Sequence, residues 1–348
     1  MEKYTGKERI EAAFRREYVD RVPFNLDIGP HYAQQVMGVS LQEYSADLDK
    51  AFEAHSKYFE VVDSDIVTVP QNVLGWWSLS NLYRFKTKTE AVTEGVLKDK
   101  SVLADLEYIE PENCLAVSQV RESCRRTNDT FKEKASRPAL PGPVWDAARL
   151  RGTQQFVLDT VEDPDFVHRL MRLTTDAVKA RVSLIGEAGP TITVIADPTA
   201  GCSVMSPSAY REFILPYHKE LFSYLREKIG GKTRLGLHIC GYTDPIMEDV
   251  MTLDIDWFEL DGEASLKKMV EVSKKRLVLR GNVGPTIFSE GTKEQIEEAV
   301  KNCIDIAAEG SAYVLSTGCQ IPLTTSLENA KYFAEAAEKY GRYKRASM

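Results

Sequence analysis

An alternation of strand and helix patterns constrains the fold of this chain more than any other feature of its sequence. From residue 140 onward, short apolar runs alternate with longer amphipathic stretches. Strands that alternate with helices pair in parallel, so the pattern predicts an α/β protein. About eight repeats indicate a closed (β/α)8 TIM barrel. An open doubly wound sheet is the alternative, although no Gly-x-Gly-x-x-Gly follows the first strand, which argues against a dinucleotide-binding version.

The predicted elements follow from these patterns. Strands are expected at residues 21–29, 65–70, 140–144, 191–197, 235–240, 255–260, 276–282 and 312–316. Helices are expected at residues 7–16, 45–59, 146–158, 163–186, 206–228, 243–252, 292–308 and 326–340, with another following residue 260 and running through residue 269.

The whole chain, residues 1–348, is expected to form one domain with an N-terminal helical extension. Residues 71–139 show a weaker pattern and are interpreted as an insertion or lid over the C-terminal face of the barrel. Trp76 and Tyr83 in this segment are candidates for binding a flat substrate, or they simply pack the insertion down.

A histidine and a cysteine stand at the end of the predicted strand 235–240. His238 and Cys240 are two residues apart, and side chains at that spacing point to the same face of a strand. An imidazole and a thiolate aimed at one point are suitable zinc ligands. The alternative is a packed histidine beside an inert buried thiol.

A second cysteine of the same kind follows the last predicted strand. Cys319 would complete a set of one imidazole and two thiolates with His238 and Cys240. Such a set with an open fourth position is typical of a catalytic zinc site. A buried free cysteine is the competing interpretation.

Acidic and amide side chains fall near other predicted strand ends. Glu259 and Asp261 could supply a fourth zinc ligand or a proton donor, or they could cap a helix. Asp197 could line the pocket or fix a turn, and Asn282 could orient the substrate or shape a turn. In a barrel the active site lies at the carboxyl ends of the strands, so these residues are expected on one face with Asp65 and the metal ligands.

The net charge of −8 argues against nucleic acid as the main partner. No apolar run is long enough to cross a bilayer. Six cysteines without a secretory signal predict a reducing cytoplasm rather than a disulfide framework.

These motifs carry a family resemblance. The matching stretches are Asp197-Pro-Thr-Ala, Met205-Ser-Pro, Phe213-Ile-Leu-Pro-Tyr, His238-Ile-Cys-Gly, Gly281-Asn-Val and Ser316-Thr-Gly-Cys-Gln-Ile-Pro. The chain resembles the zinc- and corrinoid-dependent methyltransferase branch of the uroporphyrinogen decarboxylase superfamily. The resemblance covers nearly the whole chain and is strongest after about residue 190.

The resemblance implies zinc bound by His238, Cys240 and Cys319, with the corrinoid (cobalamin) carried by a separate protein. It implies methyl transfer from a methylated substrate to cobalt, and the aromatic insertion favours an aryl methyl ether as the donor. The alternative is transfer from methylcorrinoid to a coenzyme M-type thiol. The oligomeric state is left open, with a dimer among the options.

A decarboxylase-like function is a further alternative. Residues 64–71 echo the decarboxylase segment that holds its catalytic aspartate, which makes Asp65 a candidate pocket residue. The arginine-rich motif expected after the first strand is replaced by residues 27–31, which contain no arginine. A metal-free binding protein with the same fold remains the alternative outside the enzymes.

Overall fold

The structure, a computed structural model, describes residues 4–28, 36–38, 40–71 and 78–343. The chain divides into two compact units, each assembled from segments that are distant in sequence. The first unit comprises residues 1–70, 127–137 and 256–348, and the second comprises residues 71–126 and 138–255. That the chain forms a single domain remains a prediction.

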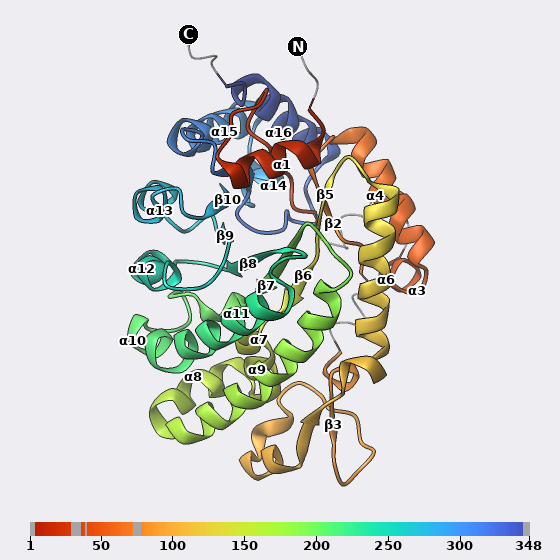
Figure 1. Ribbon diagram of the computed structural model, residues 1–348, viewed down its shortest axis with the longest axis vertical. Coiled ribbons are helices and arrows are strands. Elements are labelled where there is room, and N and C mark those ends of the chain that lie inside the picture. Colours follow the sequence, from red (N-terminus) through yellow and green to blue (C-terminus); the bar gives the residue numbers. More distant parts are fainter. Residues whose placement is uncertain (1–3, 29–35, 39, 72–77, 344–348) are drawn as a thin grey trace. The chain divides into compact units, whose positions relative to one another are not determined.

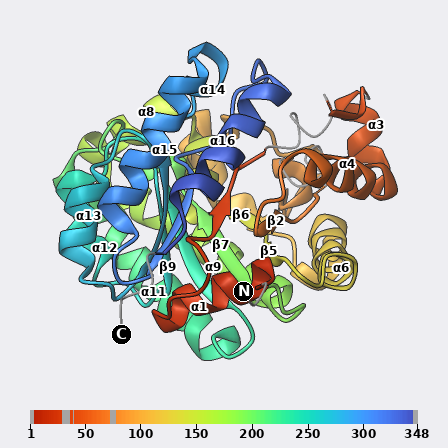
Figure 2. The same ribbon diagram turned by 90° about the horizontal axis from the view of Figure 1, so that it is seen from above.

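The first unit contains both terminal regions of the chain. Its strands are β1 (Phe24–Asn25), β2 (Ile66–Thr68), β5 (Ala135–Arg137), β9 (Trp257–Leu260), β10 (Val278–Val283) and β11 (Tyr313–Thr317). Its helices are α1 (Gly6–Arg15), α3 (Leu41–Ala46), α4 (Leu48–Val61), α13 (Leu266–Ser273), α14 (Ile287–Glu290), α15 (Lys293–Ala307) and α16 (Leu327–Tyr340). Helices α15 and α16 pack side by side (Figures 1 and 2).

The second unit holds the middle of the chain. Its strands are β3 (Tyr83–Phe85), β4 (Leu106–Tyr108), β6 (Ala139–Pro141), β7 (Ile192–Ala196) and β8 (Arg234–Ile239). Its α-helices are α6 (Leu115–Thr130, which ends in the first unit), α7 (Pro143–Arg151), α8 (Thr153–Glu162), α9 (Pro164–Gly186), α10 (Pro207–Ala209), α11 (Leu215–Ile229) and α12 (Met247–Val250). A π-helical turn, Tyr210–Ile214, joins α10 to α11, and short 3-10 turns include η1 (Leu79–Asn81), η2 (Val96–Lys98), η3 (Lys100–Asp105), η4 (Pro111–Asn113), η5 (Pro198–Ala200) and η7 (Asp244–Ile246).

The strand order confirms the predicted fold class. Seven strands follow the order β1-β11-β10-β9-β8-β7-β6, and β2 pairs in parallel with β5. The Asp65 N–H donates to the Phe24 carbonyl at 2.9 Å, which links β2 to β1. Pro138, which has no N–H to donate, separates β5 from β6, and β6 pairs in parallel with β7. This connectivity is that of a (β/α)8 barrel.

Local sequence explains where several helices begin and end. Thr5 and Glu8 form a capping box at the start of α1, the predicted N-terminal helix. The Asp163 side chain accepts from the Phe166 N–H, and Pro164 opens α9, both as predicted. The predicted helix 146–158 is instead two helices, because Gly152 adopts a φ of 90° between α7 and α8.

Residues 71–139, which the sequence predicts as an insertion or lid, contain regular helices and strands. This segment contains α6, one of the longer helices, and the barrel strand β5. The extra part is confined to the stretch before α6, where β3 and β4 pair antiparallel and pack with 3-10 turns. Within the second unit, η2 contacts α7 and β4 contacts α9. A lid over the C-terminal face remains a prediction.

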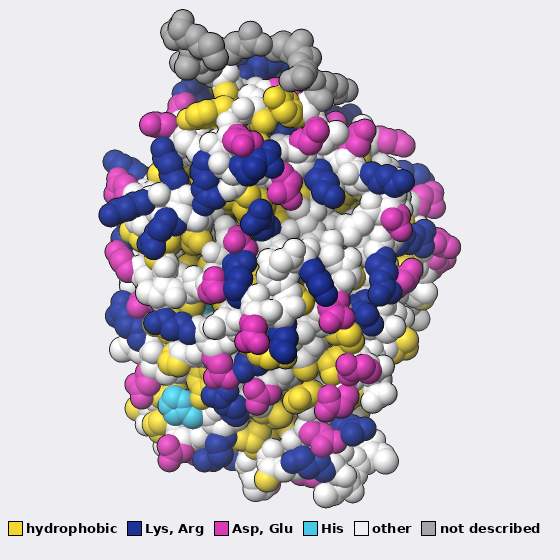
Figure 3. Space-filling model, viewed as in Figure 1, with side chains coloured by type: hydrophobic (Ala, Val, Ile, Leu, Met, Phe, Trp, Pro, Cys, Tyr) yellow, Lys and Arg dark blue, Asp and Glu magenta, His cyan; other side chains and the backbone are white. Residues whose placement is uncertain are grey.

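Surface charge and helix hydropathy bear on the predicted partners. Lysine and arginine side chains are interspersed with aspartate and glutamate over the face drawn in Figure 3. Among the described residues, every helix is too short or too polar to span a bilayer.

Candidate metal centre and its surroundings

Strand β8 brings His238 and Cys240 together as predicted. The strand ends at Ile239, and the two side chains that flank this position point the same way. His238 Nε2 lies 3.2 Å from Cys240 Sγ. His238 is buried, whereas Cys240 is partly exposed. Gly241 has a φ of 74° and turns the chain directly after the pair.

The loop after β7 holds the backbone of this pair. The Asp197 N–H donates to the His238 carbonyl at 2.9 Å, and the Cys202 N–H donates to the Tyr242 carbonyl at 2.8 Å. A side chain at Gly201 would come within 2.1 Å of the Cys240 carbonyl oxygen, so only glycine allows this approach. The His238–Cys240 segment is therefore fixed along its length by a neighbouring loop of the same unit.

Cys319 follows β11 in the first unit and is partly exposed. The Gly318 N–H donates to the Val283 carbonyl at 2.8 Å, and the Ile321 N–H donates to the Asp27 carbonyl at 3.0 Å. A Cβ on Gly318 would lie 2.2 Å from the Gly262 nitrogen. The loop that carries Cys319 is thus tightly packed between the ends of β1, β9 and β10.

The donor types and the spacing of His238 and Cys240 fit zinc. Zinc binds imidazole nitrogen and thiolate sulfur, and tetrahedral geometry with ordinary bond lengths separates the two atoms by roughly 3.5 Å. The observed separation of 3.2 Å is within a few tenths of an ångström of that value. The pair could accept a zinc ion with little movement.

Glu259, a predicted proton donor or metal ligand, is fully engaged in the first unit. Its Oε1 accepts from Arg137 Nε at 2.5 Å and from Trp257 Nε1 at 2.8 Å. Its Oε2 accepts from Arg137 Nη2 and lies 3.2 Å from Arg280 Nη1. The side chain is 1% exposed. These contacts assign Glu259 to a buried ion cluster and do not support the predicted catalytic role.

The same cluster continues to β1 through Asp27. Arg280 Nη2 lies 2.9 Å from Asp27 Oδ2 and donates to Asn25 Oδ1 at 2.6 Å. Thr68 Oγ1 donates to Asp27 Oδ1 at 3.3 Å. Sequence reasoning missed Arg137, Arg280 and Asp27 as site residues. The available signal was an arginine within or beside an apolar strand, where a buried charge requires a partner.

Asp261 and Asn282 shape the loop after β9. Asn282 Nδ2 donates to the Asp261 carbonyl at 3.0 Å and to the Ala264 carbonyl at 2.7 Å. These bonds engage the Asn282 amide in bracing the loop, the turn role that the sequence left open. The Asp261 side chain is only partly buried, and its Oδ1 accepts from the Glu263 N–H at 3.1 Å. Since Gly318 packs against the Asp261 backbone, Asp261 lies near Cys319.

Asp197 is buried and serves the second unit structurally. Its Oδ1 accepts from the Trp145 N–H at 2.8 Å, in the first turn of α7. Its Oδ2 lies 2.8 Å from Nε2 of the fully buried His218. The carboxylate therefore caps α7 and pairs with a histidine on α11, which does not support the predicted catalytic role.

Asp65 does not stand at the carboxyl end of its strand, contrary to prediction. It directly precedes β2, and its carboxylate accepts from Arg21 Nη1 at 2.6 Å, Arg9 Nη1 at 3.0 Å and the Phe24 N–H at 2.8 Å. These partners join α1 and β1 to the amino end of β2. The contacts describe a structural anchor rather than a substrate contact.

Of the two aromatic side chains predicted to bind a flat substrate, the structure describes only Tyr83. Tyr83 is 1% exposed, and its hydroxyl donates to Asp146 Oδ2 at 2.5 Å. Arg181 Nη1 lies 2.7 Å from the same oxygen. Tyr83 therefore fastens β3 to α7 and α9, which is the packing role that the sequence left open. Trp76 lies outside the described residues.

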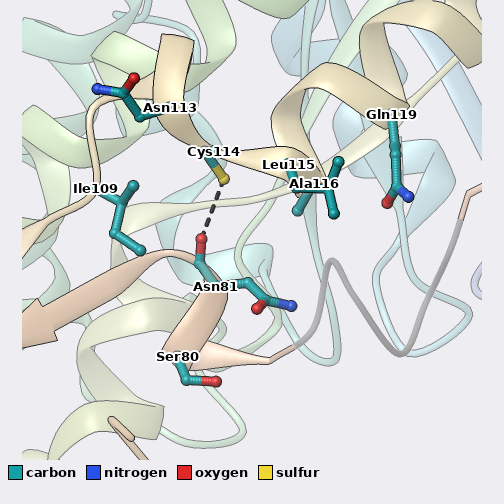
Figure 4. A pocket seen from close by; sticks show the side chains of 8 residues that line it. All are labelled: Ser80, Asn81, Ile109, Asn113, Cys114, Leu115, Ala116 and Gln119. Atoms are coloured by element: carbon teal, nitrogen blue, oxygen red, sulfur yellow. Dashed lines mark hydrogen bonds between the residues drawn. The ribbon is translucent and has the colours of Figure 1, made fainter. Parts of the chain in front are cut away.

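The second unit contains a pocket of about 360 Å³ beside the start of α6. Ser80, Asn81, Ile109, Asn113, Cys114, Leu115, Ala116 and Gln119 line it. The Cys114 sulfur points to the Asn81 carbonyl oxygen, 3.1 Å away (Figure 4). The predicted site residues are absent from this lining, which is uncharged, so the pocket has no assigned part in the chemistry.

Comparison with known proteins identifies the family. The sequence profile described as uroporphyrinogen decarboxylase (URO-D) matches residues 5–340. The chain belongs to the uroporphyrinogen decarboxylase family. A relative within this family, methylcobamide:CoM methyltransferase MtbA of Methanosarcina acetivorans, is 24% identical over 349 residues, covering 98% of this chain and 99% of the relative.

Two further comparisons agree with this placement. Methylcobamide:CoM methyltransferase MtaA of Methanosarcina barkeri is 30% identical over 205 residues, or 58% of this chain and 57% of that protein. The solved structure of a methyltransferase from Methanosarcina mazei superposes with a TM-score of 0.75 at 22% identity and covers 97% of this chain and 99% of the other. The structural likeness supports the barrel fold, and the sequence relatives place the chain in the methyltransferase branch of the uroporphyrinogen decarboxylase superfamily.

Proposed function

We propose that this chain is a zinc-dependent methyltransferase that exchanges a methyl group between a small molecule and the cobalt of a corrinoid held by a separate protein. The observation that carries the proposal is the His238–Cys240 pair, with Nε2 and Sγ 3.2 Å apart at the end of β8. It occurs in a chain that aligns over 98% of its length with a methylcobamide:CoM methyltransferase.

Cys319 is the proposed third ligand. With His238 and Cys240 it would complete one imidazole and two thiolates, the donor set of a catalytic zinc site. β8 and β11 belong to one sheet, and Cys240 and Cys319 follow the carboxyl ends of these strands. In a barrel of parallel strands those ends face the active site. The loop contacts of Gly201 and Gly318 support the ligands by holding their backbones in place.

Zinc held by two thiolates and an imidazole supplies Lewis acidity, which lowers the pKa of a thiol substrate or stabilises the oxygen that leaves a methyl ether. Cys240 and Cys319 are each partly exposed, as ligands of a metal that meets a substrate must be. Asp261, also partly exposed and near Cys319, is the acid we propose for proton transfer or transient ligation. Glu259 and Asp197 already pair with buried partners.

The relatives favour a thiol as the methyl acceptor, because their names specify coenzyme M. The case for an aryl methyl ether as donor relied on Trp76 and Tyr83. Tyr83 is 1% exposed and its hydroxyl donates to Asp146, so its packing does not favour an aryl ether over a thiol. We therefore propose transfer from methylcorrinoid to a small thiol and treat demethylation of an aryl ether as the second outcome of the same assay.

Metal content provides the first test. The purified protein should hold about one zinc per chain, and Cys319→Ala should lose most of it because two donors alone bind zinc weakly. Cys202→Ala is the matched control, since this partly exposed cysteine also follows a barrel strand yet is not a proposed ligand. Equal zinc in both variants would exclude Cys319 as a ligand, and zinc-free wild-type protein after reconstitution would exclude the mechanism.

Methyl transfer provides the second test. Methylcobalamin and a thiol should yield the methyl thioether and cob(I)alamin, which are followed by mass spectrometry and by absorbance under anaerobic conditions. Replacing the thiol with an aryl methyl ether and reduced cobalamin tests the opposite direction. Zinc-loaded protein that catalyses neither reaction would contradict the proposed function.

A further inference from the structure

The pocket beside the start of α6 is built from short stretches of the second unit. η1, the residue after β4, η4 and the first two turns of α6 each supply part of its wall. Its volume of about 360 Å³ is at the small end of the range for ligand pockets. Since a water molecule takes up about 30 Å³ in the liquid, the pocket has room for a ligand of roughly a dozen non-hydrogen atoms.

Hydrogen bonds hold the walls of this pocket in place. The Ile109 N–H donates to the Leu82 carbonyl at 2.8 Å, and the Cys114 N–H donates to the Pro111 carbonyl at 3.2 Å. The Cys114 sulfur donates to the Asn81 carbonyl oxygen at 3.1 Å, which ties the start of α6 to η1 (Figure 4). Because these contacts form the pocket before any ligand arrives, a ligand loses little affinity to ordering its walls.

Carboxamides make up most of the polar part of the lining. Asn81, Asn113 and Gln119 each present an NH₂ donor beside an acceptor oxygen. Such a side chain pairs best with a ligand edge that also places a donor next to an acceptor, as glutamine and asparagine do with adenine in nucleic acids. Carboxamides and amino-substituted nitrogen heterocycles both have an edge of this kind.

Apolar side chains lie next to these carboxamides. Leu115 and Gln119 are four residues apart on α6, so they share one face of the helix. Figure 4 shows Leu115 and Ala116 between Ile109 and Gln119. A ligand ring that packs on Leu115 and Ala116 therefore lies within reach of the Gln119 carboxamide.

The lining of the pocket disfavours ions. All of the described residues that line it are uncharged, and two exposed acids, Glu110 and Glu112, flank the lining in the sequence. An ion that enters such a pocket loses part of its hydration without gaining an ion pair. An anion is in addition repelled by the two glutamates.

We propose that this pocket binds a small uncharged molecule in which a donor and an acceptor lie side by side on the edge of a ring. The proposal assigns a ligand site whose lining contains none of the predicted metal ligands, and it does not depend on methyl transfer. Two kinds of molecule share the required chemistry, a ring that bears a carboxamide and an amino-substituted heterocycle.

Matched ligands test the preference. Nicotinamide and nicotinate share a ring and differ in carrying a carboxamide or a carboxylate. Adenine and purine share a fused ring and differ in the amino group beside a ring nitrogen. Calorimetric titration up to about 10 mM ligand should detect nicotinamide or adenine, bound roughly 10-fold or more tightly than its matched partner. The pair that shows this preference identifies the kind of ligand. Binding of neither molecule, or equal affinities within both pairs, would overturn the proposal.

Variants assign the ligand to the pocket. Gln119→Leu removes one carboxamide with little change in size and should weaken the preferred ligand by about 3- to 10-fold, the range of one hydrogen bond. Ala116→Leu fills the pocket from the same helix and should weaken it further. Gln155→Leu is the matched control, because it makes the same change at an exposed position of α8 in the second unit.

Circular dichroism of each variant shows whether the fold is intact before affinities are compared. Gln119 is only partly buried, so Gln119→Leu is expected to fold even if Ala116→Leu does not. Weaker binding in the folded pocket variants, with wild-type affinity in the α8 variant, would support the site. Wild-type affinity in the folded pocket variants, or an equal loss in the α8 variant, would show that the ligand binds elsewhere and would contradict the proposal.

Discussion

Burial decides whether an acid at a strand end can act on a substrate in this protein. Glu259 lies near the end of β9 and Asp197 follows β7, yet both are almost fully buried and pair with basic side chains. If either carboxylate left its pair to act on a substrate, a buried arginine or histidine would lose its partner, at a cost of several kcal/mol. Asp261 is partly exposed, so it could act on a substrate without breaking a buried ion pair.

Replacing Gly318 should weaken both the fold and the proposed zinc site. A Cβ there would lie 2.2 Å from the Gly262 nitrogen, so Gly318→Ala must displace the loop that carries Cys319. We expect the free energy of unfolding to fall by about 1–3 kcal/mol and the zinc affinity to fall with it. Denaturant titration and chelator competition measure the two effects.

Gly284→Ala is the control for this prediction. Gly284 lies in the same unit, and a Cβ there meets nothing within 4 Å. The substitution should leave both quantities nearly unchanged. A Gly318 variant that binds zinc like the wild type would show that the Cys319 loop tolerates movement or that Cys319 is not a ligand.

His55 gives the protein a pH-dependent stability. Burial lowers the pKa of this α4 side chain from 6.5 to about 4. Between those values the unfolded chain binds a proton that the folded protein does not, so stability falls as the pH falls through this window, by about 3 kcal/mol in total. Denaturant titrations of metal-free protein at pH 7.5 and pH 4.5 should show the loss. His55→Met should remove most of the difference, and an unchanged difference would assign the acid sensitivity to other groups.

At the scale of elements, most of the fold was predictable because strand and helix periodicities are strong after residue 140. The missed elements have weak patterns for a physical reason. The buried face of α6 includes Ala116, Ser123, Cys124 and Thr127, small or polar side chains that give little hydrophobic signal. In β5 the residues after Ala135 are a serine and an arginine, buried only because Asn128 and Glu259 satisfy them.

The candidate ligands were predictable from spacing, whereas the roles of the surrounding acids were not. The i and i+2 positions of His238 and Cys240 follow from strand geometry alone. The partners of Glu259 and Asp65 come from segments far away in the sequence, such as Arg137 for Glu259 and Arg21 for Asp65. Sequence periodicity carries no information about such pairings. The sequence pattern around an acid near a strand end is therefore the same whether its carboxylate is buried in an ion pair or exposed to substrate.

The start of helix α7 is capped by a residue from another part of the chain. Its own first residues provide no side-chain cap, and Asp197 from the β7 loop supplies one through the Trp145 N–H. Asp197→Ala should lose this cap and leave His218 buried without its carboxylate, which lowers the free energy of unfolding by about 2–4 kcal/mol. Asp197→Asn keeps one acceptor oxygen and should lose less.

The same variants distinguish structure from catalysis. If Asp197 is only structural, folded Asp197→Asn should retain methyl transfer within a few-fold of the wild type. A kcat loss of 100-fold or more with unchanged stability and zinc content would restore the catalytic role that the sequence suggested.

At the scale of the whole molecule, the first barrel strand depends on the last. β1 pairs in parallel with β11, and the Asp27 N–H donates to Thr317 Oγ1 across 290 residues of sequence. Pairings between such distant segments close late, because the loop entropy must be overcome before the contact forms. The first unit therefore cannot complete its sheet until nearly all of the chain is present.

During protein synthesis, β1 is made long before its partner strand β11. At the usual 5–20 residues per second, β1 emerges from the ribosome roughly 15–60 seconds before β11 does. During that interval Val22, Phe24 and Leu26, all buried in the finished protein, lack their final neighbours. Chains arrested before Tyr313 should be cleaved by protease in this region, whereas full-length chains should resist. The nascent chain is thus the form of this protein most in need of a chaperone.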